Sequence, residues 1–261
     1  MTGRSKGEGG SAPDPERAVR ADAERPLPKR FYETARAERC DDGFLILLDD
    51  RPVRTPAKAE LRLPTAALSE AVVQEWSDQE TVVDPATMPL TKLANTAIDR
   101  VQGREPEIVE EVVGYAGTDL LCYRADTPEE LVALQAAAWD PVLAWIEAHH
   151  DARFEVATGI LHVAQSDESL ACIRALAGRF DAFRLTALHN MTTLTGSAIL
   201  ALARAHGHLT AEAIWTAAHV DEDWQISKWG EDAEAQRRRE LRRREMMSSS
   251  KLLELLGEMA G

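Results

Sequence analysis

The sequence has 261 residues, of which 44% are hydrophobic and 28% are charged. This is the composition of an ordinary globular protein, and the length suffices for one large domain or two smaller ones without a disulfide or metal to hold them together. The 44 acidic side chains outnumber the 30 basic ones, giving a formal net charge of -14. Such a charge repels nucleic acid and anionic lipid. It either suits a basic or partly apolar protein partner or serves only solubility.

Several features point to a reducing compartment. The three cysteines, Cys40, Cys122 and Cys172, lie far apart, which predicts neither a disulfide framework nor a zinc site. No apolar run reaches the ~18 residues of a membrane span, so we expect no membrane insertion. Residues 1–25 mix acidic residues with glycine and proline, unlike a leader peptide, and are predicted to be a disordered tail. We expect a cytoplasmic monomer without a cofactor.

A strand pattern follows the predicted tail. Phe31–Thr34 and Phe44–Leu48 flank the turn residues 41–43, which predicts a hairpin. A second turn at residues 49–52 and a short strand at residues 60–63 extend the hairpin to a small antiparallel sheet.

The pattern becomes helical after the sheet. Thr65 is a predicted N-cap, and Leu68, Val72, Val73 and Trp76 follow at helical spacing. This helix is expected to cover one face of the sheet.

Nearly every segment from about residue 101 onward is predicted to be helical. Thr127-Pro128-Glu129-Glu130 has the order of an N-cap, a first-turn proline and a capping-box glutamate. Asp140-Pro141 should end or kink the helix that starts there. Further helices are predicted over residues 166–179, 183–205 and 210–232.

The expected fold class is therefore α+β. A small antiparallel β domain at residues 26–100 is followed by a larger all-helical domain at residues 101–261. The arginine-rich run at residues 234–245 contains the i,i+4 pairs Glu234/Arg238 and Glu240/Arg244. These pairs favour a solvated helix over a nucleic-acid site.

The sequence lacks the usual marks of an active site. It has no G-x-x-x-x-G-K-[ST] loop, no G-x-S-x-G elbow and no H-E-x-x-H pattern. His149-His150 and His206-Gly207-His208 contain neighbouring histidines that point in different directions on a helix. His219 and Asp223 share a face, but a zinc site needs a third protein ligand. We therefore assign no catalytic residue and no metal ligand.

The predicted helix at residues 210–232 has a carboxylate in an otherwise apolar stripe. That stripe contains Ala211, Trp215, Ala218, Glu222, Ile226 and Trp229. A buried unpaired carboxylate is costly. Glu222 either pairs inside the fold or joins the tryptophans in anchoring a partner. A third alternative is an enzyme that uses His219, Glu222 and Asp223 as an acid/base or metal cluster, and a general protein-binding adaptor is a fourth.

The sequence resembles the ATP12 family, the assembly chaperones that attend the α subunit of the F-type ATP synthase head. The matching residues occur in order over about residues 26–232. They are Lys29-Arg30-Phe31-Tyr32, Arg54-Thr55-Pro56, Glu75-Trp76, Met88-Pro89-Leu90-Thr91, Asn95, Thr118-Asp119, Cys122-Tyr123-Arg124, Trp139-Asp140-Pro141, Gln225 and Trp229-Gly230. Trp224 departs from the tyrosine often found in relatives, and residues beyond Asp232 match poorly. With no leader recognised, a bacterial member is expected.

The resemblance implies a chaperone without enzymatic activity that binds the unassembled α subunit. In the family an acidic residue before the W-G pair is functionally important, and the matching residues are Asp221-Glu222-Asp223. The position of Glu222 in the stripe favours it among the three. The expected partner-contacting residues are Glu222, Asp221, Asp223, Trp215, Gln225 and Trp229.

Overall fold

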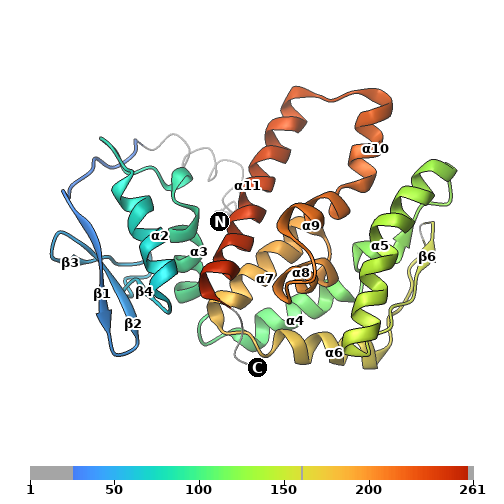
Figure 1. Cartoon of the computed structure of the whole chain (residues 1–261), viewed down its shortest axis with the longest axis horizontal. Coiled ribbons are helices and arrows are strands. Elements are labelled where there is room, and N and C mark those ends of the chain that lie inside the picture. Colours follow the sequence, from blue (N-terminus) through green and yellow to red (C-terminus); the bar gives the residue numbers. More distant parts are fainter. Residues whose placement is uncertain (1–25, 160, 258–261) are drawn as a thin grey trace, which may run out of the picture.

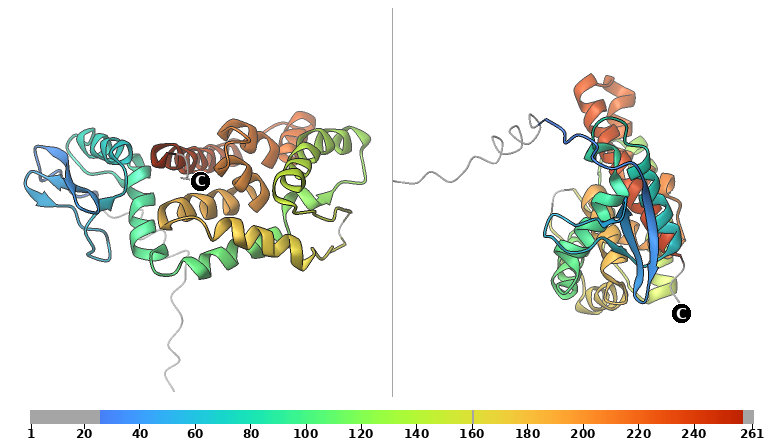
Figure 2. Two further views of the ribbon diagram at one scale, coloured as in Figure 1. Left: turned by 60° about the horizontal axis from the view of Figure 1, so that its bottom comes forward. Right: turned by 90° about the vertical axis from the view of Figure 1, so that its left-hand side faces the viewer.

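The computed structural model describes residues 26–159 and 161–257, and it confirms the α+β class. A small antiparallel sheet lies at one end of an elongated molecule, and helices form the remainder (Figures 1 and 2). The predicted tail at residues 1–25 lies outside the described residues. In the part of the chain that the structure describes, no helix is long and apolar enough to cross a bilayer.

The sheet is built on a hairpin of β1 (Ala35–Cys40) and β2 (Gly43–Leu48). Gly43 has φ +129°, and a Cβ there would lie 2.4 Å from the Leu63 carbonyl oxygen, so only glycine fits. The predicted strand Phe31–Thr34 is wrong. The Asp49 carboxylate accepts from the backbone N–H of Thr34 at 3.0 Å, while the Thr34 carbonyl accepts from Asp49 N at 2.8 Å, so a side chain takes one of the two strand hydrogen bonds.

Two short strands complete the sheet. β3 (Arg51–Pro52) and β4 (Arg62–Leu63) both pair antiparallel with β2. Helix α2 (Ala66–Ser77) covers the sheet, and its predicted N-cap is confirmed, since Thr65 Oγ1 accepts from Leu68 N at 3.2 Å.

Helix α3 (Pro89–Thr96) links the sheet to the helical body. It follows the 3₁₀ turn η1 (Pro85–Thr87) and continues into the π-helical turn η2 (Ala97–Val101). Glu75 from α2 caps α3, because its carboxylate accepts from Leu90 N at 2.7 Å and from Thr91 N at 2.8 Å.

The helical body surrounds an apolar centre. Its elements are α4 (Glu105–Ala116), η3 (Leu120–Cys122), α5 (Glu129–His150), α6 (Asp167–Ala177), α7 (Ala182–Thr195), α8 (Ala198–Ala205), α9 (Ala211–Ala218), α10 (Val220–Trp229) and α11 (Ala233–Leu256). Every residue from Ala198 to Ala203 is fully buried, which places α8 at the centre. A parallel pair of two-residue strands, β5 (Tyr123–Arg124) and β6 (Ala157–Thr158), lies among the helices.

The start of α5 differs from the prediction. The helix begins at Glu129, with Pro128 in the cap position and no capping side chain. The Thr127 hydroxyl contacts Asp126 Oδ1 at 3.4 Å instead of a helix N–H. The predicted N-cap role of Thr127 is therefore wrong.

Helix α5 also continues through Pro141, so the predicted end there is wrong. Proline inside a helix costs about 3 kcal/mol. The same helix buries Trp139, Val142, Trp145 and Ile146. Each such side chain contributes roughly 1.5–3 kcal/mol, which outweighs the lost hydrogen bond.

The predicted helix at residues 183–205 is two helices. Gly196, at φ 71°, ends α7, and the Ser197 hydroxyl caps α8 by accepting from Leu200 N at 3.0 Å. Glycine followed by serine is an ordinary stop-and-start signal.

Helix α11 joins the predicted arginine-rich helix to the apolar residues after it. The predicted pairs are present, with Glu234 to Arg238 at 3.6 Å and Glu240 to Arg244 at 2.9 Å. Its last turns bury Leu252, Leu253 and Leu256. The helix contacts α7, α3 and α2, so it holds the sheet end and the helical body together (Figure 1).

Candidate functional site

The predicted helix at residues 210–232 is wrong, because the chain bends at His219 between α9 and α10. In a continuous helix the Ala217 carbonyl would accept from the N–H four residues later. Here it accepts from the Trp139 indole N–H at 2.7 Å. The bend redirects the apolar stripe, so that Trp215 is buried at 6% exposure while Trp229 is 72% exposed.

His219 fills the inside of the bend. Its ring centroid lies 3.7 Å from that of Trp215, and its Nδ1 is 2.8 Å from the Trp215 carbonyl oxygen. Burial lowers the pKa of His219. The neutral ring therefore donates from Nδ1 to the carbonyl and fixes the direction in which α10 leaves α9.

Three carboxylates occupy the first turn of α10, where the helix dipole favours negative charge. Asp221 accepts from Gln135 Nε2 at 2.7 Å. Glu222 Oε2 lies 3.5 Å from Arg239 Nε, and Asp223 contacts the same guanidinium. The Glu222 side chain remains 42% exposed. Glu222 is thus both loosely paired and accessible.

Helix α5 supports α10 on its other side. Glu130 accepts from Trp224 Nε1 at 3.1 Å, and its carboxylate lies 2.6 Å from Lys228 Nζ. These hydrogen bonds lower the pKa of Glu130. Together, α5 and α11 fix the orientation of α10 from two sides.

The outer end of α10 presents an exposed tryptophan. The rings of Trp224 and Trp229 meet edge to face, with centroids 5.4 Å apart. Gly230 ends the helix at φ 83° and ψ 178°, a conformation open essentially only to glycine. Figure 1 shows α10 and the first turns of α11 projecting from the helical body. We call the half-exposed Glu222 and the exposed residues Asp223, Gln225 and Trp229 the α10 surface.

The structure divides the predicted partner-contacting residues into two groups. Trp215 belongs to the core, and Asp221 is bound by Gln135, so both support α10 from beneath. The other four form the α10 surface. Arg239 was missed as a member of this site, although the basic run in which it lies was visible in the sequence.

Comparison with known proteins decides the family. The sequence model of the ATP12 chaperone protein matches residues 29–147. The crystal structure of Atp12 from Paracoccus denitrificans is 40% identical in sequence with a TM-score of 0.83, and the match covers 87% of this chain and 98% of that one. The chain belongs to the ATP12 chaperone family.

Two further relatives agree with this. The structure of a candidate chaperone from Agrobacterium tumefaciens is 44% identical with a TM-score of 0.85, covering 94% of this chain and 92% of that chain. The mitochondrial protein atp12 of Schizosaccharomyces pombe is 24% identical over 229 residues, which cover 81% of this chain and 79% of that protein. The resemblance to ATP synthase assembly chaperones that the sequence motifs indicated is confirmed.

The alternative of an acid/base or metal cluster gains no support from this family or from the geometry. His219 Nε2 lies 3.9 Å from Glu222 Oε2, beyond hydrogen-bond distance. Among residues 26–159 and 161–257, no three His, Cys, Asp or Glu side chains are arranged to hold a metal ion.

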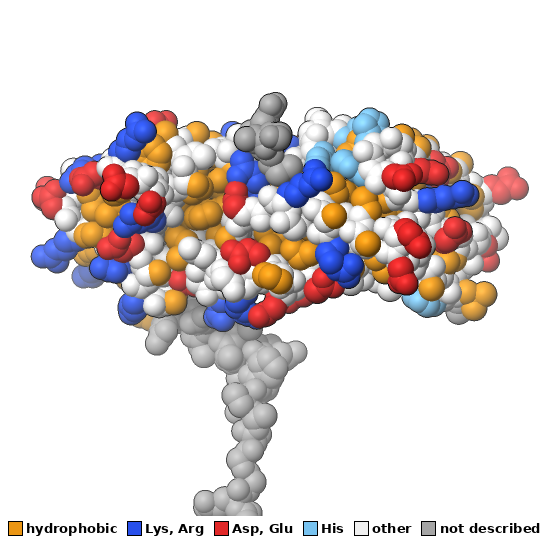
Figure 3. All heavy atoms as spheres, turned by 90° about the horizontal axis from the view of Figure 1, so that it is seen from below, with side chains coloured by type: hydrophobic (Ala, Val, Ile, Leu, Met, Phe, Trp, Pro, Cys, Tyr) orange, Lys and Arg blue, Asp and Glu red, His pale blue; other side chains and the backbone are white. Residues whose placement is uncertain are grey.

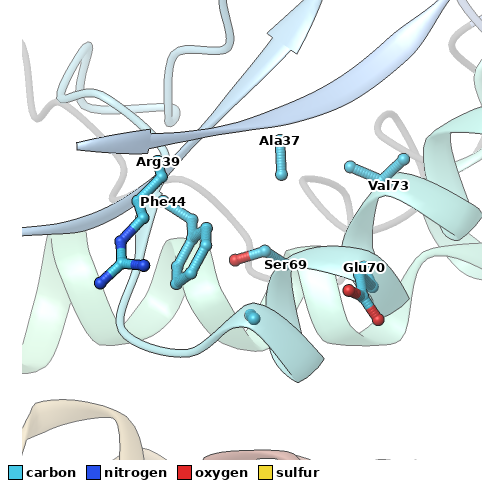
Figure 4. A pocket seen from close by; sticks show the side chains of 7 residues that line it. Ala37, Arg39, Phe44, Ser69, Glu70 and Val73 are labelled. Carbon is cyan, nitrogen blue, oxygen red and sulfur yellow. The ribbon is translucent and has the colours of Figure 1, made fainter.

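The surface of this ATP12 family member also has hollows away from α10. One pocket of about 290 Å³ lies between the hairpin, which contributes Arg39 and Phe44, and α2, which contributes Ser69 and Glu70 (Figure 4). On the face seen in Figure 3, acidic and basic side chains alternate with apolar ones. Despite the net negative charge, this face has no field of a single sign.

Acidification is expected to destabilise the protein through three buried or half-buried histidines. Burial lowers the pKa of His150, His206 and His219 below the ordinary 6.5. Below about pH 6.5 the unfolded chain therefore binds more protons than the folded one, and the free energy of unfolding falls as the pH falls. Each extra proton bound by the unfolded chain lowers the free energy of unfolding by up to about 1.4 kcal/mol for each pH unit of acidification.

Urea denaturation at pH 7.5, 6.5 and 5.5 measures this effect. The variant His206→Asn should show a smaller change in the free energy of unfolding with pH. Asp119 acts in the opposite direction, because burial raises its pKa to about 6 from the ordinary 3.8. Its contribution is present at low pH and lost as the pH rises through 6, so Asp119→Asn should steepen the fall on acidification. In the Asp119→Asn variant, which lacks this opposing effect, a free energy of unfolding that is constant or rises from pH 7.5 to 5.5 would contradict the histidine argument.

Proposed function

We propose that this chain is an assembly chaperone that binds the unassembled α subunit of the F-type ATP synthase. By covering the apolar surface that the α subunit later buries against its β neighbour, it prevents aggregation until assembly displaces it. Its action is binding alone, as a cytoplasmic monomer without cofactor or catalysis. Membership of the ATP12 chaperone family supports this proposal.

The α10 surface is the proposed contact. The single observation that carries the choice is Trp229, which is 72% exposed at the projecting end of α10. Tryptophan is enriched among the residues that dominate binding energy at protein interfaces. Beside it, Glu222 and Asp223 provide fixed negative charges for a basic region of the partner.

Co-purification tests this function. The tagged chain is expressed with untagged α subunit, and separately with untagged β subunit, and each lysate is passed over an affinity column. We expect stoichiometric capture of free α subunit and none of β. Failure to retain α would contradict the proposal, and retention of many unrelated proteins would favour a general adaptor.

A further inference from the structure

A second hollow lies where the sheet end meets α3, apart from α10. Its volume of about 810 Å³ is within the range of ligand-binding pockets. Its lining residues are Pro56, Ala57, Trp76, Val83, Pro85, Met88, Thr91, Lys92, Asn95, Thr96, Asp99 and Arg100. We call this hollow the α3 groove. Its walls are mainly apolar, with a few polar groups at defined places.

Two polar atoms of the α3 groove lack partners. Trp76 Nε1 and Asn95 Oδ1 are buried and make no hydrogen bond within the described part of the chain. Other polar groups of the groove are already engaged: Asp99 accepts from Thr55 Oγ1 at 2.6 Å and from Ala57 N at 2.9 Å. Among the buried polar atoms of the lining, one donor and one acceptor thus have no partner, which matches the carbonyl and N–H that a peptide backbone offers.

The free charge of the groove is positive. Lys92 Nζ lies 3.2 Å from a Glu245 carboxylate oxygen. Arg100 is exposed and forms no ion pair with any residue in the described ranges. The only acid of the lining, Asp99, is turned toward Thr55 and Ala57. In a chain of net charge -14, an unpaired arginine beside an apolar groove suits a partner with a carboxylate.

We propose that the α3 groove binds an extended, acidic segment of the client protein. This inference rests on the proposed function and adds a second contact to it. A small side-chain rotation lets Trp76 Nε1 donate to a backbone carbonyl of the segment and lets Asn95 Oδ1 accept from a backbone N–H. Arg100 pairs with a carboxylate of the segment. The client is thus held by its basic region at α10 and by an acidic segment at α3.

The decisive variants are Asn95→Leu and Arg100→Glu. Leucine has nearly the shape of asparagine and removes an acceptor that is unpaired in the free chain, so the melting temperature should stay level or rise. Both variants should nevertheless weaken binding of purified α subunit, measured by titration calorimetry, by roughly tenfold. Arg153→Glu is the matched control, because Arg153 is exposed in the helical body outside the groove.

The outcomes separate this inference from the proposed function. If the wild-type chain binds α subunit and both groove variants bind it equally well, the groove contact is overturned while the proposed function stands. If the wild-type chain does not bind α subunit, both are overturned. A benzophenone cross-linker placed at exposed Thr96 should label an α-subunit peptide that contains Asp or Glu, and labelling only of peptides without either would overturn the acidic segment.

Discussion

Replacing Trp139 by alanine is expected to lower the free energy of unfolding by about 3–5 kcal/mol, the range for large aromatic side chains in cores. Trp139 is 1% exposed at the centre of α5. Its indole N–H donates to the Ala217 carbonyl at 2.7 Å, and the guanidinium of Arg124 lies over its ring at 5.1 Å. The variant loses the buried ring, the contact to Arg124 and the only partner found for that carbonyl among the described residues.

Equilibrium urea denaturation measures this loss of stability. The variant Trp139→Phe separates the contribution of the hydrogen bond from that of the buried ring. Phenylalanine keeps most of the ring but cannot donate to the Ala217 carbonyl, so it should cost about 1–3 kcal/mol. A Trp139→Ala variant within about 1 kcal/mol of the wild type would contradict the stabilising role assigned to the buried ring and its hydrogen bond.

The sequence predicted those parts of the fold that local signals determine. Thr65 caps α2, Gly43 allows the hairpin turn, and the pairs of α11 form at their i,i+4 spacing. Each is indicated by residues within a few positions of one another, such as the turn residues 41–43, although Gly43 also lies close to the Leu63 carbonyl. Such signals act in the same way wherever the segment is placed in the molecule.

The errors occur where distant residues compete with a local signal. Pro141 was predicted to end or kink α5, but the helix does not end there, because its core contacts are worth more than the lost hydrogen bond. The break at His219 has neither glycine nor proline to mark it. Beside the break, the Ala217 carbonyl accepts from the indole of Trp139, which lies 78 residues before Ala217 in the chain. Periodicity alone cannot detect such a contact.

The candidate site was predicted in part for the same reason. The sequence indicated a carboxylate among tryptophans, and the structure has Glu222 between buried Trp215 and exposed Trp229. The apolar stripe was predicted on one continuous helix, so it could not distinguish the buried tryptophan from the exposed one. Arg239, the partner of Glu222 and Asp223, lies on α11, and no spacing rule connects it to α10.

Replacing Glu222 by lysine is expected to weaken binding of the α subunit by a hundredfold or more, with little loss of stability. The change reverses a charge at the proposed contact and places an ammonium group beside Arg239. The new ammonium group and the guanidinium of Arg239 would then both repel a basic region of the partner. The Glu222 side chain is 42% exposed, and its pairing distance to Arg239 is 3.5 Å. The Arg239 side chain is only 19% exposed, but it keeps its contact to Asp223 when Glu222 is replaced. Losing the half-exposed Glu222 pair and its interaction with the helix dipole should therefore cost only about 1 kcal/mol of folding free energy.

The control for this prediction is Glu168→Lys. Glu168 is exposed in the first turn of α6, which lies away from α10. Replacing it by lysine therefore reverses a charge near a helix N-terminus, as Glu222→Lys does, without changing the proposed contact. Binding of α subunit by Glu168→Lys should equal that of the wild type. A large fall in melting temperature for Glu222→Lys alone would mean that Glu222 serves mainly as the internal partner of Arg239.

Arg239→Gln distinguishes the two roles of Glu222 directly. If Glu222 contacts the partner, freeing it from Arg239 leaves its charge available, and the variant should bind α subunit at least as tightly as the wild type. If Glu222 matters only through Arg239, the single variants Glu222→Gln and Arg239→Gln and the double variant Glu222→Gln, Arg239→Gln should share one reduced affinity. Measured affinities for the three variants form a double-mutant cycle, and its coupling energy determines which description holds.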